Sequence, residues 1–219
     1  MSPVSGSSFV PHASTTSEIG DPGLSSSSAN HSLLSSLARL ANGRGGPIAL
    51  FLWAAAEAVA LPVIPDVLLG LLLLAAPRRF LILFAALCLG SLAGSLLLYG
   101  LTVADPEAVR HLLLGLPGID EPMLTAASRT VASGNPSCLL LFGPGTPLKV
   151  FTFVWANDLV SPIGFLPAVI LNRISRIAPL ALAQAGIGAL APDFLRRHER
   201  LVVGLYVAAY AVVYALYLL

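Results

Sequence analysis

The feature that most constrains this chain is a pair of carboxylates in the apolar stretch FLWAAAEAVALPVIPD, residues 51–66. Glu57 lies in the middle of the apolar run, and Asp66 follows a break made by Pro62 and Pro65. A carboxylate at the centre of a membrane helix costs about 2.5–3.5 kcal/mol on insertion scales. A chain that carries two of them beside a helix break is expected to use them, so the stretch indicates a site inside a membrane.

The composition is that of an integral membrane protein. The 219 residues are 56% apolar and only 11% charged, whereas an ordinary soluble domain is about 25% charged. The formal net charge is +1, so we expect no nucleic-acid partner. Two cysteines and four histidines are scattered along the chain, which predicts no disulfide framework and no metal site. No nucleophile–base pair is recognisable, and we expect neither a cofactor nor an enzyme.

Two segments precede the first apolar run. Residues 1–32 are rich in Ser, Pro and Gly. Such a segment buries too little apolar surface to offset its ordering entropy, so we predict that it is disordered. Residues 33–46 are predicted to form an amphipathic helix at the membrane surface, with Arg39 on its wet side, followed by a glycine-rich linker.

The apolar runs at 47–77 and 137–160 are each interrupted near the centre. The interruptions are marked by prolines at Pro62, Pro65, Pro144 and Pro147. A single spanning helix needs about 20 continuous apolar residues, so two half-helices that meet at a turn fit each run better. We predict two re-entrant hairpins with their tips in the protein interior, because open backbone at membrane depth is tolerated only there or beside a wet cavity.

Each predicted hairpin is followed by a predicted spanning helix, at 80–101 and 162–190, and residues 201–219 form a last span. The polar stretch 102–136 should form one or two short amphipathic helices outside the hydrocarbon. The predicted fold class is an all-α integral membrane protein. It is an inverted repeat of two re-entrant helical hairpins, each followed by a transmembrane helix, plus a C-terminal transmembrane helix. The repeat occupies residues 47–190.

This topology separates the charges. One face holds seven arginines, Arg39, Arg44, Arg78, Arg79, Arg196, Arg197 and Arg200, and the other holds the acidic 102–136 stretch. The excess of arginine predicts that the first face, with the N-terminus, is cytoplasmic. Gly90 and Gly94 are four residues apart, a spacing that predicts close packing of the first span against another helix of the same chain.

Five charged residues reach the membrane midplane by separate arguments: Glu57, Asp66, Lys149, Arg173 and Arg176. With a rise of about 1.5 Å per residue, Glu57 lies roughly 15 Å deep, half of a hydrocarbon core of about 30 Å. Opposite charges at one depth should pair, because each alone is costly. The pairs either staple helices together or form a binding site, and intramembrane ionisable residues favour the second reading.

Four stretches together resemble a known family: EAVALPVIPDVLL (57–69), GSLAGSLLLYG (90–100), GPGTPLKVFTF (143–153) and NRISRI (172–177). In this order they resemble the DedA membrane proteins, also called the SNARE-associated or VTT-domain family, and in particular its YqaA-like branch. The resemblance implies two re-entrant loops that face each other and translocation of lipid in a bacterial-type plasma membrane. It also implies that Glu57 and Asp66 are the essential acids and Arg173 and Arg176 the essential arginines.

Three functions stay open at the level of the sequence. The first is a flippase or scramblase for a polyprenyl phosphate or a phospholipid, in which Arg173 and Arg176 hold the phosphate and Lys149 adds a charge. A buried carboxylate that takes up a proton would couple this transport to protons. The second is a proton-coupled antiporter of a small solute or ion, and the third is a membrane assembly protein. A homo-oligomer is compatible with all three.

Overall fold

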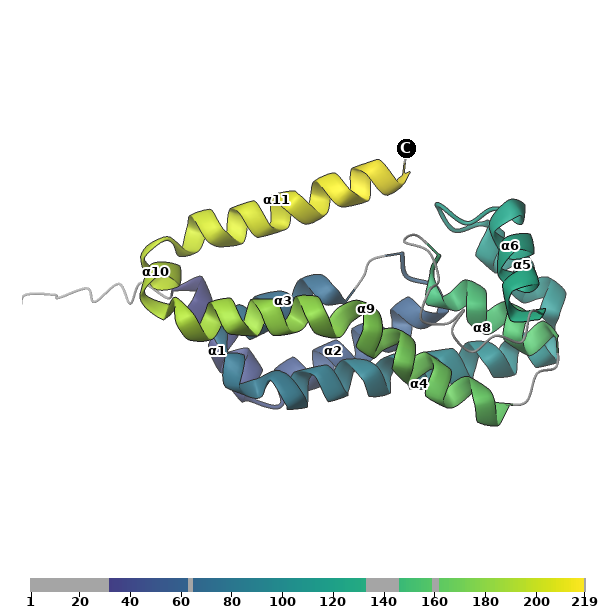
Figure 1. Cartoon of the computed structure of the whole chain (residues 1–219), viewed down its shortest axis with the longest axis horizontal. Coiled ribbons are helices and arrows are strands. Elements are labelled where there is room, and N and C mark those ends of the chain that lie inside the picture. Colours follow the sequence, from purple (N-terminus) through teal and green to yellow (C-terminus); the bar gives the residue numbers. More distant parts are fainter. Residues whose placement is uncertain (1–31, 63–64, 133–145, 159–161, 219) are drawn as a thin grey trace, which may run out of the picture. The chain divides into compact units, whose positions relative to one another are not determined.

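The computed structural model describes residues 32–62, 65–132, 146–158 and 162–218, with side chains to residue 215 at the C-terminal end. Within these ranges all regular structure is helical and no strand occurs, so the all-α prediction is confirmed for the described residues (Figure 1). The segment predicted to be disordered, 1–32, lies outside them except for Ser32.

The first half of the chain contains a helix, a break and a second helix, as predicted. α1 (Leu33–Asn42) is followed by α2 (Gly45–Val59) and, after the break, by α3 (Asp66–Ala75). Pro65 is the N-cap of α3, a place that suits proline because the first amide groups of a helix have no intrahelical acceptor. α2 and α3 run in opposite directions from the break (Figure 1). α2 begins two residues before the predicted start, because Gly45 and Gly46 join the helix.

Two helices of the described residues are long and apolar enough to cross a membrane. After the short 3-10 turn η1 (Pro77–Arg79), α4 spans Phe80–Ala104 and extends three residues past the predicted end. α9 spans Pro162–Leu190, as predicted. Pro167 and Pro179 lie inside α9, and Figure 1 shows that the helix bends near its middle. A proline inside a helix removes one hydrogen bond and clashes with the preceding turn, which accounts for such a bend.

The remaining helices are shorter or lie at the C-terminal end. α5 (Pro106–Leu114) and α6 (Glu121–Ala132) lie in the polar stretch, where one or two short helices were expected. α8 (Leu148–Asn157) lies in the second predicted hairpin. The first arm of that hairpin, residues 137–145 with Pro144, lies outside the described residues. α10 (Pro192–Arg197), which the sequence did not predict, leads into α11 (Glu199–Leu218).

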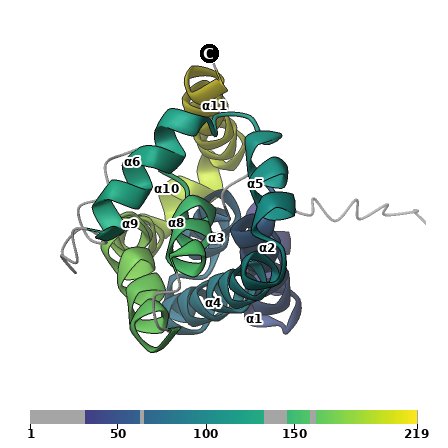
Figure 2. The ribbon, with the colours of Figure 1, turned by 90° about the vertical axis from the view of Figure 1, so that its right-hand side faces the viewer.

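α8 is the most enclosed helix. It packs against α4, α6 and α9, and Figure 2 shows it surrounded by other helices. Nearly all of its residues are buried, including Lys149 and Thr152. A helix that is apolar on all sides is expected to be buried on all sides, but a buried lysine in such a helix needs a specific partner.

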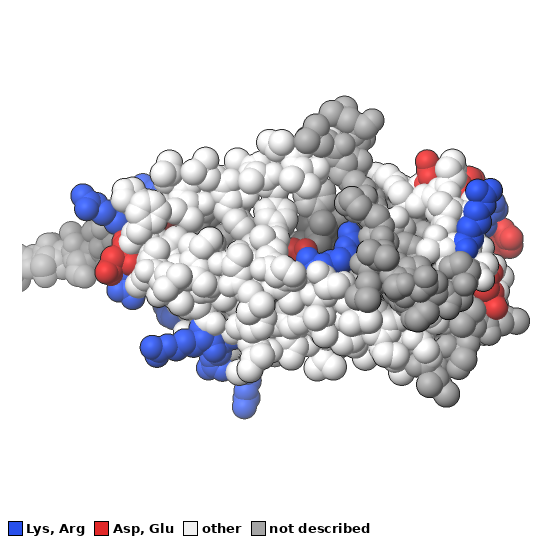
Figure 3. Space-filling view, in the orientation of Figure 1, with Lys and Arg blue, Asp and Glu red and all other residues white. Residues whose placement is uncertain are grey.

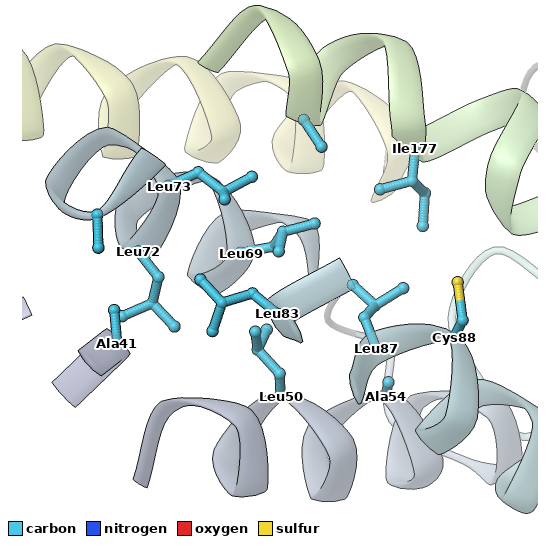
Figure 4. Packing of buried hydrophobic residues seen from close by; sticks show 12 residues of the cluster. Ala41, Leu50, Ala54, Leu69, Leu72, Leu73, Leu83, Leu87, Cys88 and Ile177 are labelled. Carbon is cyan, nitrogen blue, oxygen red and sulfur yellow. The ribbon is translucent and has the colours of Figure 1, made fainter. Parts of the chain in front are cut away.

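The helices are held together by apolar packing and by close backbone contacts. The main cluster joins α2, α3, α4 and α9 through Leu50, Leu69, Leu83, Leu87 and Ile177, among others (Figure 4). On α4, a Cβ atom at Gly90 or Gly94 would overlap the backbone of α2. The predicted close approach of α4 to a helix of the same chain is therefore confirmed.

α3 and α8, the short helices of the two predicted hairpins, each pack mainly on the long helix of the other half of the predicted repeat. α3 packs mainly on α9, and α8 packs mainly on α4, while each packs less on the long helix of its own half. Basic side chains are concentrated at one end, as expected. Figure 3 shows mainly basic side chains, with a few acidic ones, at the end that holds α1 and α10, and acidic side chains together with basic ones at the end that holds α5 and α6.

Candidate functional site

All five charged residues predicted from the sequence line one cavity of about 310 Å³: Glu57, Asp66, Lys149, Arg173 and Arg176. We call them the charged cluster. The cavity lies where the break between α2 and α3, the start of α8 and the middle of α9 meet. Figure 3 shows acidic and basic atoms in a hollow of the surface. The structure thus brings the five residues together, while their role in binding stays a prediction.

Glu57 and Arg173 form a buried ion pair between α2 and α9. Arg173 Nη2 donates to Glu57 Oε2, and the two residues are only 6% and 7% exposed. The expectation that opposite charges at this depth pair is confirmed for these two. Removing one member of such a pair leaves an uncompensated buried charge, which is strongly destabilising.

Lys149 and Arg176 bind carbonyl groups of the two helix breaks. Lys149 Nζ donates to Leu61 O over 2.7 Å, and Arg176 Nη1 donates to Thr146 O over 3.1 Å. Helix ends leave carbonyl and amide groups without intrahelical partners, and these two cations satisfy one carbonyl at each break. Lys149 is buried whereas Arg176 is exposed, so Arg176 can exchange its carbonyl partner for a ligand more easily.

Asp66 departs from the expectation that the opposite charges pair. It is the first residue of α3, and its Oδ1 atom is buried without a hydrogen-bond partner in the described part of the chain. The two arginines are engaged by Glu57 and by Thr146 O. Arg173 Nε is likewise buried without a described partner. The charged cluster therefore holds an open acceptor and an open donor, a state that buried polar groups rarely keep without water or a ligand.

The site favours an anion. Three cations and two carboxylates line the cavity, and α3 and α8 both begin there. The N-terminus of a helix carries a partial positive charge and free amide groups, which attract negative groups. Among the described residues, no group of three or more His, Cys, Asp or Glu side chains is placed to hold a metal ion.

The sequence analysis missed the contribution of α11. Val213 and Tyr214 line the cavity, and Tyr214 Oη donates to Pro62 O over 3.4 Å. Tyr206 Oη donates to Asp66 O over 3.3 Å and accepts from Gln184 Nε2 over 3.1 Å. The signal was the recurrence of tyrosine every fourth residue from Tyr206 to Tyr214, which indicates one hydroxyl-bearing face. Of the turn prolines, Pro62 and Pro147 line the cavity and Pro65 caps α3.

Comparison with protein-family models, with curated proteins and with solved structures gave no match. The function is therefore argued from the geometry of the site.

Proposed function

We propose that the protein is an integral membrane protein that moves a lipid with a phosphate headgroup between the two leaflets, as the resemblance to the DedA family implies. The observation that carries the proposal is the cavity, where three cations and two helix N-termini surround an open donor of a buried arginine. Phosphate, like carboxylate, matches arginine in both charge and geometry, and the resemblance to the DedA family favours phosphate.

The fold is compatible with membrane insertion. α4 and α9 are long enough to span a bilayer, and α11 adds a helix of 20 residues. We propose that α2 and α3 form a re-entrant hairpin, because each is too short to span alone. The arginine-rich end would face the cytoplasm, and the acidic end would face the opposite side.

An inverted repeat is supported by the exchange of packing partners. A two-fold operation that carries α3 onto α8 and α4 onto α9 also carries the α3–α9 contact onto the α8–α4 contact, and both contacts are present. In transporters built from inverted repeats, the substrate site lies where the repeats meet, beside broken helices. The cavity occupies the corresponding place, because it joins the α2–α3 break to the start of α8.

The residues of the cavity suggest how a phosphate would be held. Glu57 Oε2 accepts a hydrogen bond from Nη2 of Arg173 and so holds the guanidinium in place. The Nε atom of Arg173 has no partner among the described residues. Arg176 would release Thr146 O for a phosphate oxygen, because phosphate adds charge attraction and a bidentate geometry that a single neutral carbonyl lacks. Of the two carboxylates that line the cavity, Asp66 is the one without an ion pair among the described residues. It is therefore the group to take up a proton when the phosphate enters.

The proposal is tested by transport in phosphatidylcholine vesicles that contain the purified protein. Fluorescent polyprenyl phosphate and fluorescent phosphatidylcholine are followed separately between leaflets, with and without a pH gradient. We expect movement of the phosphate lipid that Arg176→Gln abolishes and Arg129→Gln keeps, because Arg129 is exposed on α6, away from the cavity. Loss of transport in both variants, or in neither, would contradict the phosphate role. Proton flux without movement of either lipid would favour the antiporter.

A further inference from the structure

The turn between α5 and α6 forms a wall of the charged cavity that the charged cluster does not explain. It reads GLPGID over residues 115–120, and its residues Leu116, Pro117 and Ile119 line the cavity. Turns are usually polar, and the surrounding stretch 102–136 was predicted to be polar. An apolar turn that faces five charged side chains therefore needs a reason.

Among the described residues, this turn is the only wall that offers the cavity no polar side chain. The other walls each provide a charged or hydroxyl-bearing side chain: Glu57 from α2, Asp66 from α3, Lys149 from α8, Arg173 and Arg176 from α9, and Tyr214 from α11. Those walls are joined to one another by an ion pair and by hydrogen bonds. The side chains of Leu116, Pro117 and Ile119 can form neither, so moving them away from the cavity breaks only apolar contacts.

α5, the turn and α6 form a helical hairpin at the end of the protein opposite α10 (Figure 1). Arg110 of α5 and Glu121 of α6 form an ion pair at 2.6 Å that links the two helices. Asp105 caps α5 and Asp120 caps α6, each by accepting a hydrogen bond of 2.9 Å from a backbone amide. Asp105 alone joins α5 to α4. The hairpin is thus linked internally and attached to α4 at one point, so it can move as one body.

α5 and α6 also line a second cavity of about 310 Å³, together with the C-terminal end of α8. We call it the outer cavity, and the side of the protein opposite the arginine-rich end the outer side. Most of its lining residues are polar: Glu107, Arg110, Thr125, Ser128, Asn157 and Asp158. No described residue lines both cavities.

An apolar layer separates the two cavities along α8. This helix begins at the charged cavity with Lys149 and ends at the outer cavity with Asn157. Between these residues Val150 and Phe151 belong to one apolar cluster with residues of α5 and α6, such as Leu113. A narrow apolar layer between two polar compartments blocks passage because it excludes water, and it opens when its walls part.

We propose that the α5–α6 hairpin is the gate of the charged cavity on the outer side. Its apolar turn closes the cavity, and a swing of the hairpin about Asp105 joins the charged cavity to the outer cavity. The inference rests on the proposed function and adds the route by which a headgroup reaches the outer leaflet. While the gate is closed, its apolar wall keeps water from the charged cluster and so strengthens the attraction between these charges and an anion.

Two leucines four residues apart provide a matched test. Leu116 lines the charged cavity, whereas Leu112 is 43% exposed and lines neither cavity. The reporter is a cysteine in place of Thr146, which also lines the charged cavity, in a chain whose Cys88 and Cys138 are replaced by alanine. The rate at which this cysteine reacts with a charged, membrane-impermeant thiol reagent is measured in sealed membrane vesicles of both orientations.

Leu116→Ser should raise this rate from the outer side by at least about fivefold, because a hydroxyl group admits water to the apolar turn. Leu116→Met and Leu112→Ser should change it less than about twofold, since the first keeps an apolar side chain of similar volume and the second lies away from the cavity. A cysteine at the exposed Glu107 identifies the vesicles that present the outer side. From the arginine-rich side no variant should change the rate. A rise from both sides indicates a loosened fold and would overturn the gate, as would equal rates in Leu116→Ser and Leu112→Ser.

The reporter cysteine reacts whether or not lipid moves, so the gate and the proposed function can fail separately. Movement of a fluorescent polyprenyl phosphate is therefore followed in vesicles that contain the same variants. Access that depends on Leu116, without movement of the lipid in any variant, would support the gate and contradict translocation. Movement of the lipid with access that does not depend on Leu116 would overturn the gate and keep translocation.

Discussion

Replacing Gly94 by alanine should separate α4 from α2. A Cβ atom at Gly94 would lie 2.9 Å from the carbonyl carbon and 2.9 Å from the Cα atom of Ala55, and closer still to the carbonyl oxygen. Because carbon atoms pack at about 3.5–4.0 Å, the two helices must move apart by roughly 0.6–1 Å. The atoms in the way belong to backbone, so no change of rotamer relieves the overlap.

A control variant on the same helix separates the cost of the backbone overlap from the gain that alanine brings to any helix. Overpacking a well-packed contact costs about 1–3 kcal/mol, and alanine in a helix gains about 0.8–1.0 kcal/mol over glycine. A Cβ atom at Gly100 meets nothing within 4 Å. Gly100→Ala therefore measures only the higher helix propensity of alanine. The difference in free energy of unfolding between the two variants should therefore be about 1–3 kcal/mol, with Gly94→Ala the less stable.

The same displacement reaches the site, because Ala55 lies two residues before Glu57. Gly94→Ala should weaken the Glu57–Arg173 pair and lower transport, whereas Gly100→Ala should leave transport unchanged. Stability is measured by denaturant unfolding in detergent micelles, followed by circular dichroism, and transport by the vesicle assay. If Gly94→Ala proves as stable and as active as Gly100→Ala, the backbone contact between α2 and α4 is not what positions Glu57.

Three further predictions concern other parts of the structure. Glu57→Gln should lower the free energy of unfolding by about 3–5 kcal/mol, because it leaves the buried charge of Arg173 without a counter-charge. The double variant with Arg173→Gln should recover much of this stability but not transport. Pro179→Ala should straighten α9 without loss of unfolding stability and lower transport, because the bend aims the arginines of α9. At the arginine-rich end, the hydrogen bond from Ser32 holds the pKa of Glu199 below its ordinary value of 4.5. Thermal stability should therefore fall as the pH drops below that value, and Ser32→Ala should reduce this fall.

Much of the fold followed from the positions of proline and charge. Pro62 and Pro65 end one helix and begin the next because proline lacks an amide hydrogen and restricts the preceding residue. α9 was predicted with its observed bounds, since its apolar length leaves little choice of ends. The gathering of the five charges followed from counting depth along apolar helices, and this works because helix rise is fixed.

The partners of Lys149 and Arg176 did not follow from the sequence, whereas the pairing of Glu57 with an arginine did. Lys149 and Arg176 bind the backbone carbonyls of Leu61 and Thr146 rather than carboxylates. Because every residue carries a backbone carbonyl, the sequence does not mark which one accepts such a bond. The sequence analysis assigned no tyrosine of α11 to the site, although Tyr214 reaches the break. Spacing within a helix fixes which residues share a face, but not which other helix that face meets.

The ion pair between Glu57 and Arg173 joins residues 116 positions apart, which bears on how the chain is made. Synthesis at about 5–20 residues per second leaves roughly 6–23 s between the two residues. During that interval α2 has no arginine of α9 to neutralise its carboxylate, whereas α4, which packs on α2, follows much sooner. If α2 and α3 form the proposed re-entrant hairpin, this carboxyl group would have to stay at the aqueous surface, or enter the bilayer without its partner, until α9 is made. On that proposal, a chain that ends before Arg173 should insert its first hairpin poorly.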